Sequence, residues 1–204
     1  GDLPGFGGGN EIAQVFQGQV HFTTIIEIFD IVLQKSVFAN ESDSSQHRFK
    51  SEQLRGALMP VTVNCDMGES YGLWRMGDDA GLMPFIHIAN VACGFHASDF
   101  DHMRTTVRLA KTHGVKVGAH PSLPDLQGFG RREMKMGREE MANCLIYQIG
   151  ALCGFLRAEG MELNHIKPHG SLYGMAARQE DIAQAVCDAA DVFKVPLLGM
   201  TGTL

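Results

Sequence analysis

Three side chains in this sequence could together hold a divalent metal ion: Asp66, His96 and His120. One carboxylate oxygen and two imidazole nitrogens form a donor set that suits Zn, Mn, Fe or Co. The residues lie 30 and 24 positions apart, so no single helix carries them and the fold must bring them together. The alternative interpretation is a set of hydrogen-bonded polar residues with a structural role.

A second group of residues could bind substrate and transfer protons. Lys167 is a point cation suited to a carboxylate or phosphate, and the nearby imidazole of His169 can carry a proton at neutral pH. Asp66 and Glu69 could supply a general base and a cation ligand. Alternatively, Asp66 and Gly68 could simply stabilise a turn. We therefore predict Asp66, Glu69, Lys167 and His169 as catalytic residues. Asn64, which shares a strand face with Asp66, is predicted to bind substrate.

The stretch 118–132 contains three glycines, two prolines and the pair Arg131 and Arg132. A loop this elaborate often carries function, and its arginines could grip a carboxylate or phosphate. They could equally form surface ion pairs that stabilise the protein little. We predict both arginines as substrate-binding. The sequence contains neither a phosphate-binding loop pattern nor a complete dinucleotide motif, so its motifs predict no nucleotide cradle.

Short apolar runs alternate with stretches of helical periodicity from residue 59 onward. The pattern predicts strands at residues 61–65, 86–93, 115–119, 164–167 and 195–200, and helices at 101–113, 138–159 and 180–193. This alternation indicates an α/β fold with a parallel sheet and right-handed crossovers. Polar residues lie at the carboxyl end of each predicted strand: Asp66, His96, His120, Lys167 with His169, and Thr201. Because parallel strands end at one edge, we expect a functional site there.

Composition excludes several classes of protein. The 204 residues are 45% hydrophobic and have a net charge of −6, which argues against a nucleic-acid or membrane-surface partner. We find no run of about 18 apolar residues, so we predict no membrane span. The five cysteines form no C-x-x-C pair, which favours a reducing compartment, and we predict a cytoplasmic protein.

Residues 1–58 differ from the remainder of the chain. The first ten residues are half glycine, and residues 40–55 form a polar, serine-rich stretch. We predict that 1–58 is a poorly ordered extension, with Met59 as the natural start of the domain at 59–204. A functional extension is the alternative.

Four blocks resemble the LamB/YcsF family: residues 64–69, 89–99, 118–132 and 167–173. The resemblance runs from about Val61 to Leu204. It implies a (β/α) barrel of the glycoside hydrolase/deacetylase type, here truncated after the fifth predicted strand. It also implies a place in the ATP-dependent opening of 5-oxoproline to glutamate, with ATP as cofactor and two other oxoprolinase subunits as partners. Ser98 departs from the family pattern, which usually has glycine there.

Three functions are open on the sequence alone. The first is a subunit of ATP-dependent 5-oxoprolinase, which hydrolyses the lactam of 5-oxo-L-proline to L-glutamate. The second is a stand-alone metal-dependent deacetylase-like hydrolase, suggested by the aspartate and histidines alone. The third is a non-catalytic subunit that binds partners and leaves the chemistry to them.

Overall fold

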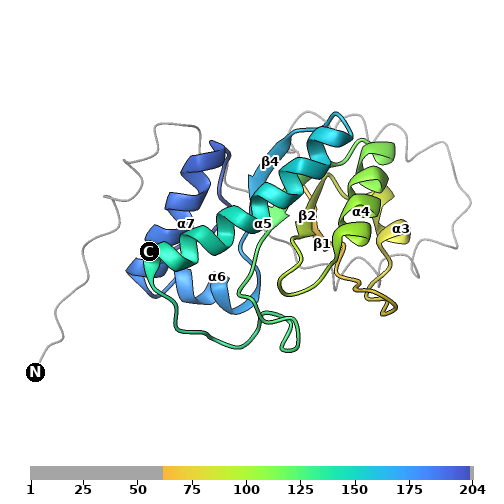
Figure 1. Cartoon of the computed structure of the whole chain (residues 1–204). Helices are drawn as coiled ribbons and strands as arrows, with labels where there is room; N and C mark the ends of the chain where they lie inside the picture. Colours follow the sequence, from red (N-terminus) through yellow and green to blue (C-terminus); the bar gives the residue numbers. More distant parts are fainter. Residues whose placement is uncertain (1–61, 203–204) are drawn as a thin grey trace, which may run out of the picture.

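A computed structural model describes residues 62–202 (Figure 1). The predicted extension at 1–58 lies outside the described residues. Four parallel strands form one sheet in the order β1-β2-β3-β4. They are β1 (Asn64–Met67), β2 (Ile88–Ala92), β3 (Lys116–His120) and β4 (Leu163–Ile166). The helices are α3 (Asp79–Leu82), the 3-10 helix η3 (Met83–Phe85), α4 (Phe100–His113), α5 (Arg138–Ala158), α6 (Gly170–Ala176) and α7 (Glu180–Phe193). The α/β class and the parallel sheet are therefore confirmed.

The register of the sheet places Asp66, Asn90 and Gly118 in one row across three strands. Asp66 on β1 pairs with Asn90 on β2, and Asn90 pairs with Gly118 on β3. The pairing of β3 with β4 is irregular between Val117 and Ala119. Side chains in one lateral row of a parallel sheet point to the same face, so these positions share the face that carries the site.

Helix α4 shows why the sequence pattern located the helices well. Its N-cap residue, Asp99, accepts hydrogen bonds from the backbone N–H groups of Asp101 and His102. The helix ends at Gly114, whose φ of 67° lies in the left-handed region where glycine is favoured. The apolar residues between these caps face the core, and α5 and α7 bury predicted stripes in the same way.

Helix α5 is the central helix of the layer and packs against α7 and α4 (Figure 1). It is 21 residues long and contains an 18-residue window with a mean hydropathy of 1.2, which by length and composition would suffice to cross a membrane. Its buried residues are Met141, Ala142, Leu145, Gln148, Ile149, Leu152 and Leu156. Because a core helix in a globular fold meets the same length and composition test, this feature is weak evidence for a membrane span.

The structure corrects three parts of the predicted element list. The first strand begins at Asn64 rather than at residue 61, so Asp66 lies within the strand instead of after it. The predicted fifth strand reduces to a single parallel bridge between Ile166 and Leu197. Helices α3 and α6 and the 3-10 helix were not predicted, because segments of three to seven residues are too short to show a helical period.

Candidate metal centre and adjoining cavity

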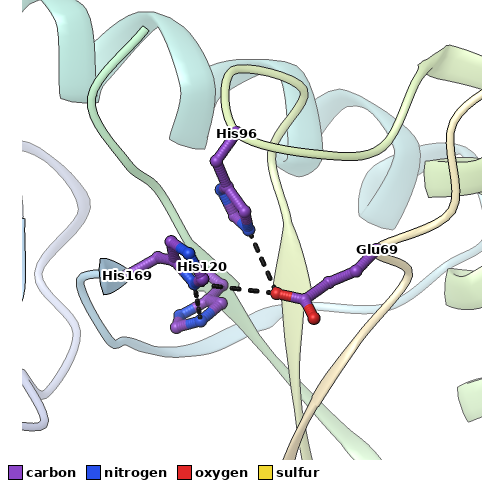
Figure 2. A group of neighbouring side chains, drawn as sticks. All are labelled: Glu69, His96, His120 and His169. Atoms are coloured by element: carbon purple, nitrogen blue, oxygen red, sulfur yellow. Dashed lines mark hydrogen bonds and ion pairs between the residues drawn. The ribbon is translucent and has the colours of Figure 1, made fainter. Parts of the chain in front are cut away.

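Four side chains meet at the carboxyl edge of the sheet: Glu69, His96, His120 and His169 (Figure 2). One potential ligand atom from each lies within 4.8 Å of all the others. Glu69 and His96 come from the loops after β1 and β2, His120 ends β3, and His169 is the N-cap of α6. The three imidazoles are buried. This cluster could bind a metal ion.

Backbone carbonyls determine which ring nitrogen carries the proton in His120 and in His169. His120 Nδ1 lies 2.6 Å from the carbonyl oxygen of Lys167, and His169 Nε2 lies 2.9 Å from that of Phe129. A carbonyl oxygen only accepts, so both of these nitrogens must donate. In neutral rings the remaining nitrogens, His120 Nε2 and His169 Nδ1, are therefore bare, and they lie 3.0 Å apart. Burial, with the nearby histidines, lowers the pKa of His169 to about 3.

His96 and Glu69 complete the cluster. His96 Nε2 lies 3.2 Å from Glu69 Oε1, and the His96 ring stacks on His169 with centroids 3.7 Å apart. Burial, with the charge of His120, lowers the pKa of His96 to about 3, and burial raises the pKa of Glu69. Among the described residues, buried His96 Nδ1 has no hydrogen-bond partner. A neutral imidazole beside a buried carboxylate is the chemistry of a cation ligand pair.

Two loop conformations hold these ligands. Before Glu69, the N–H of Gly68 donates to the Asp79 carboxylate at 2.8 Å, and a side chain at Gly68 would press on Thr106. After His96, Ser98 is buried with a φ of 73°, a region that favours glycine. Glycine would adopt this backbone conformation with less strain than serine does.

Asp66 lies beside the cluster and is tied to Lys167. Asp66 Oδ1 accepts from Lys167 Nζ at 2.6 Å and from Asn90 Nδ2 at 2.8 Å. Asp66 Oδ2 lies 3.3 Å from His120 Nε2. Burial alone would raise the pKa of this carboxyl, but the His120 ring in its imidazolium form and the Lys167 ammonium, which donate to it and carry positive charge, outweigh burial and hold the pKa well below its usual range. Asp66 is therefore ionised at neutral pH.

A cavity of about 420 Å³ adjoins the cluster. It is lined by Asp66, His120, Arg131, Lys167, Pro168, His169, Gly170, Ser171 and Tyr173. Within the described chain the Arg131 guanidinium has no carboxylate partner and lies over the Phe129 ring at 5.6 Å. The Tyr173 hydroxyl is buried and likewise lacks a partner among the residues described. The cavity thus offers cations and hydroxyls to a small anionic ligand.

The structure gathers most of the predicted site residues, but not all of them. Arg132 pairs with Asp125 rather than lining the cavity, its Nε lying 3.1 Å from each carboxylate oxygen. Asn64 accepts a hydrogen bond from Asn90 at 2.7 Å and also lies outside the cavity lining. Exposed Thr201 is not a lining residue either.

Sequence reasoning missed several polar residues near the site. Asn90 lies inside the apolar strand β2 and His165 inside the mixed strand β4, and a polar residue within a predicted strand was the available signal. Ser171 and Tyr173 follow the predicted Lys167 motif directly, but residue type alone did not separate them from an ordinary helix start.

Comparison with known proteins places the chain in a family. The model of the LamB/YcsF family matches residues 61–204. The chain belongs to the LamB/YcsF family. It is 56% identical over 141 residues to the lactam utilization protein lamB of Emericella nidulans, covering 69% of this chain and 55% of that protein. It is 51% identical over 138 residues to the A subunit of 5-oxoprolinase from Vibrio campbellii, covering 68% and 55%.

A solved structure shows the same fold. The lactam utilization protein from Thermus thermophilus superposes with a TM-score of 0.70 at 50% sequence identity, covering 71% of this chain and 60% of that chain. This LamB/YcsF chain spans about half the length of the curated relatives it matches.

Proposed function

We propose that this LamB/YcsF chain contributes the hydrolytic site of a 5-oxoprolinase subunit, which opens the lactam of 5-oxo-L-proline to L-glutamate. The observation that carries the proposal is the Asp66–Lys167 pair, 2.6 Å apart, lying between the histidine cluster and the cavity. The names of the relatives, a lactam utilization protein and the A subunit of 5-oxoprolinase, agree with a small cyclic amide as substrate.

The cavity residues divide into two roles in this proposal. The unpaired guanidinium of Arg131 binds the substrate carboxylate, because a planar guanidinium matches a carboxylate with two parallel hydrogen bonds. Lys167 holds Asp66 in place and places positive charge where the lactam oxygen becomes negative. Ionised Asp66 accepts a hydrogen bond from the attacking water and orients it, because a carboxylate whose pKa is held this low is a weak base.

We further propose that Glu69, His96, His120 and His169 bind a divalent cation such as Zn, Mn, Fe or Co. The residues fit such an ion, because two bare nitrogens face each other while their rings donate to carbonyls, as metal-bound imidazoles do. His120 Nε2 and His169 Nδ1 lie 3.0 Å apart, so one ion could contact both nitrogens. When bound, the ion would polarise the lactam carbonyl and acidify a water molecule. A proton shared by His120 and His169 is the competing explanation.

The wider assembly is part of the same proposal. ATP as cofactor and two other oxoprolinase subunits as partners come from the family resemblance, and the naming of several relatives as A subunits supports a multi-subunit enzyme. All five cysteines are free, which supports a reducing, cytoplasmic location. The sequential order β1-β2-β3-β4 without a switch point supports a (β/α) barrel of the glycoside hydrolase/deacetylase type rather than a doubly wound sheet.

One experiment separates this function from its rivals. The chain is purified alone and with the two partner subunits, then assayed for metal content and for 5-oxoproline turnover with ATP. Turnover that needs the partners and is lost in the Asp66→Asn variant supports the proposal. Amide hydrolysis by the chain alone, without ATP, would favour the deacetylase-like hydrolase that the histidine cluster also suggests. Full turnover with Asp66→Asn would leave a partner-binding role.

A further inference from the structure

A chain of polar side chains crosses the sheet beneath the site. His165 on β4 lies with its Nε2 2.6 Å from Asn90 Oδ1 on β2. Asn90 Nδ2 in turn donates to Asn64 Oδ1 at 2.7 Å and to Asp66 Oδ1 at 2.8 Å, both on β1. Asn90 is 0% and His165 is 3% exposed, so neither has water as a substitute partner. All three hydrogen bonds of the Asn90 side-chain amide are therefore made to other protein side chains.

These partners fix the direction of the chain. Only the NH2 group of Asn90 can face the oxygens of Asn64 and Asp66, because both oxygens accept. The Asn90 carbonyl must then face His165, and His165 Nε2 must carry the proton. Burial, with the charges of His120 and Lys167, lowers the pKa of His165 to about 4, so the ring is neutral near pH 7. His165 thus donates to Asn90, and Asn90 in turn donates to the Asp66 carboxylate.

Gly118 on β3 leaves the room that His165 needs to contact Asn90. β3 lies between β2 and β4, so His165 must cross β3 to contact Asn90. It crosses at Gly118, where a Cβ atom would overlap the His165 ring. Gly118 also pairs with Asn90 in the register of the sheet. The imidazole of His165 fills the space that a side chain at position 118 would occupy.

We propose that Asn90 and His165 are positioning residues that hold the Asp66 carboxylate between Lys167 and His120, and that Gly118 is required for them to do so. The consequence for turnover rests on the proposed function, whereas the hydrogen-bond chain itself does not. Lys167 and His120 contact Asp66 from β4 and β3, whereas Asn90 approaches it from β2. Losing the Asn90 contact leaves the carboxylate free to swing, and a displacement near 1 Å can cost about 100-fold in rate.

The first test needs no activity. In ¹⁵N NMR of the chain, the neutral His165 ring should be protonated at Nε2, with an imidazole proton slow to exchange with water. Gly118→Ala should displace the ring and abolish that signal. Gly150→Ala on α5 is the matched control, because a Cβ there meets nothing within 4 Å. A wild-type His165 protonated at Nδ1, or an unchanged signal in Gly118→Ala, would overturn the proposal.

The second test measures turnover of 5-oxoproline by the assembly with its partner subunits. Asn90→Leu and Gly118→Ala should each lower kcat by about 10- to 100-fold with little change in KM, since neither residue lines the cavity. Their double variant should be no worse than the more impaired single variant. His165→Gln, whose amide can still donate to Asn90, should retain more kcat than His165→Leu.

The two tests distinguish failure of the proposed function from failure of the positioning role. An inactive wild-type assembly would reject the proposed function, while the NMR result would still decide the hydrogen-bond chain. Unchanged kcat in folded Gly118→Ala, or additive losses in the double variant, would reject the positioning role. If Asn90→Leu does not fold, Gly118→Ala and the His165 pair decide, because they leave the amide of Asn90 in place.

Discussion

His120 Nε2 and His169 Nδ1 face each other at 3.0 Å, while the opposite nitrogen of each ring donates to a backbone carbonyl. Two bare nitrogens at this distance repel one another unless a cation lies between or beside them. Glu69 Oε1, 3.6 Å from the same His169 nitrogen, adds negative charge to the point where the two lone pairs converge. The four ligands therefore form a position where a positive charge stabilises the folded chain.

The identity of the ligands is tested by metal affinity. Replacing Glu69 by Gln or His169 by Ala should weaken binding of Co²⁺ by at least about tenfold, because each substitution removes a ligand, and even supporting contacts are worth that much. Isothermal titration with CoCl2 and the visible absorption of bound Co²⁺ measure this. The control is His113→Ala, since His113 is exposed at the carboxyl end of α4, whereas the loop that carries His96 leads into the amino end of that helix.

The same titration decides between the two possible carboxylate ligands. Glu69→Gln should weaken Co²⁺ binding more than Asp66→Asn, because Asp66 is already held by Lys167 and Asn90. The opposite order would restore the set predicted from sequence, with Asp66 beside His96 and His120. No Co²⁺ binding by wild type at all would leave a shared proton as the explanation of the histidine pair.

Substitution of Lys167 tests the proposed charge stabilisation. Lys167→Met keeps most of the apolar stem and removes the ammonium that donates to Asp66 at 2.6 Å. The loss of this charge-assisted hydrogen bond should cost about 2–4 kcal/mol of transition-state stabilisation, or roughly 30- to 1,000-fold in kcat. Steady-state 5-oxoproline turnover by the assembly measures it. The control Lys116→Met changes an exposed lysine at the amino end of β3. Equal kcat in Lys167→Met and wild type would remove Lys167 from the mechanism.

Much of the fold could be predicted because its signals are local. The caps and apolar stripes of α4, α5 and α7 repeat at short spacing, and the structure confirms these helices to within one or two residues. The end of the first strand was misplaced, because the run at 61–65 is apolar whereas the observed strand continues through Asp66. Polar Asp66 can lie within a strand because Asn90 on the neighbouring strand β2 and Lys167, just after β4, donate hydrogen bonds to it, and local sequence does not show such contacts.

The sequence predicted which edge of the sheet carries the site, but not which side chains form the cluster that could bind a metal ion. Strand-end position correctly grouped His96, His120 and His169. It did not distinguish Asp66 from Glu69, because the loop after β1 brings Glu69 to His96 and His169, while Asp66 is held by Lys167 and Asn90. Arg131 and Arg132 are adjacent in sequence, yet only Arg131 lines the cavity, since Asp125 holds the other. Pairings of this kind depend on the loop conformation.

The two arginines should therefore respond differently to substitution. Arg131→Met should raise KM for 5-oxoproline by about tenfold or more, because one charged hydrogen-bonding group contributes about 1.5–3 kcal/mol. Arg132→Met should leave kcat and KM close to wild type but lower the free energy of unfolding, because the Asp125 carboxylate, whose side chain is only 3% exposed, loses its guanidinium partner. Steady-state kinetics and urea unfolding of both variants measure this. Similar KM values for the two variants would contradict the assigned role of Arg131.

The final prediction concerns the pH dependence of stability due to His165. Its pKa falls from 6.5 to about 4 on folding, because burial and then the charges of His120 and Lys167 disfavour the imidazolium and outweigh Asp66. Between about pH 4 and pH 6.5 the unfolded chain thus binds more protons at this position than the folded chain. The free energy of unfolding should rise with pH across that window, and the His165 contribution should be lost as pH falls through it.

His165→Gln isolates this contribution, because glutamine can donate to Asn90 and does not titrate. Urea unfolding with a chelator present, across the same window, should show a shallower pH dependence for His165→Gln than for wild type. Other buried histidines affect both proteins alike, so only the difference between the two curves is interpreted. His113→Gln, at an exposed position near the end of α4, should reproduce the wild-type slope. Parallel curves for His165→Gln and wild type would show that His165 does not gain a proton on unfolding, and would contradict a neutral His165 buried against Asn90.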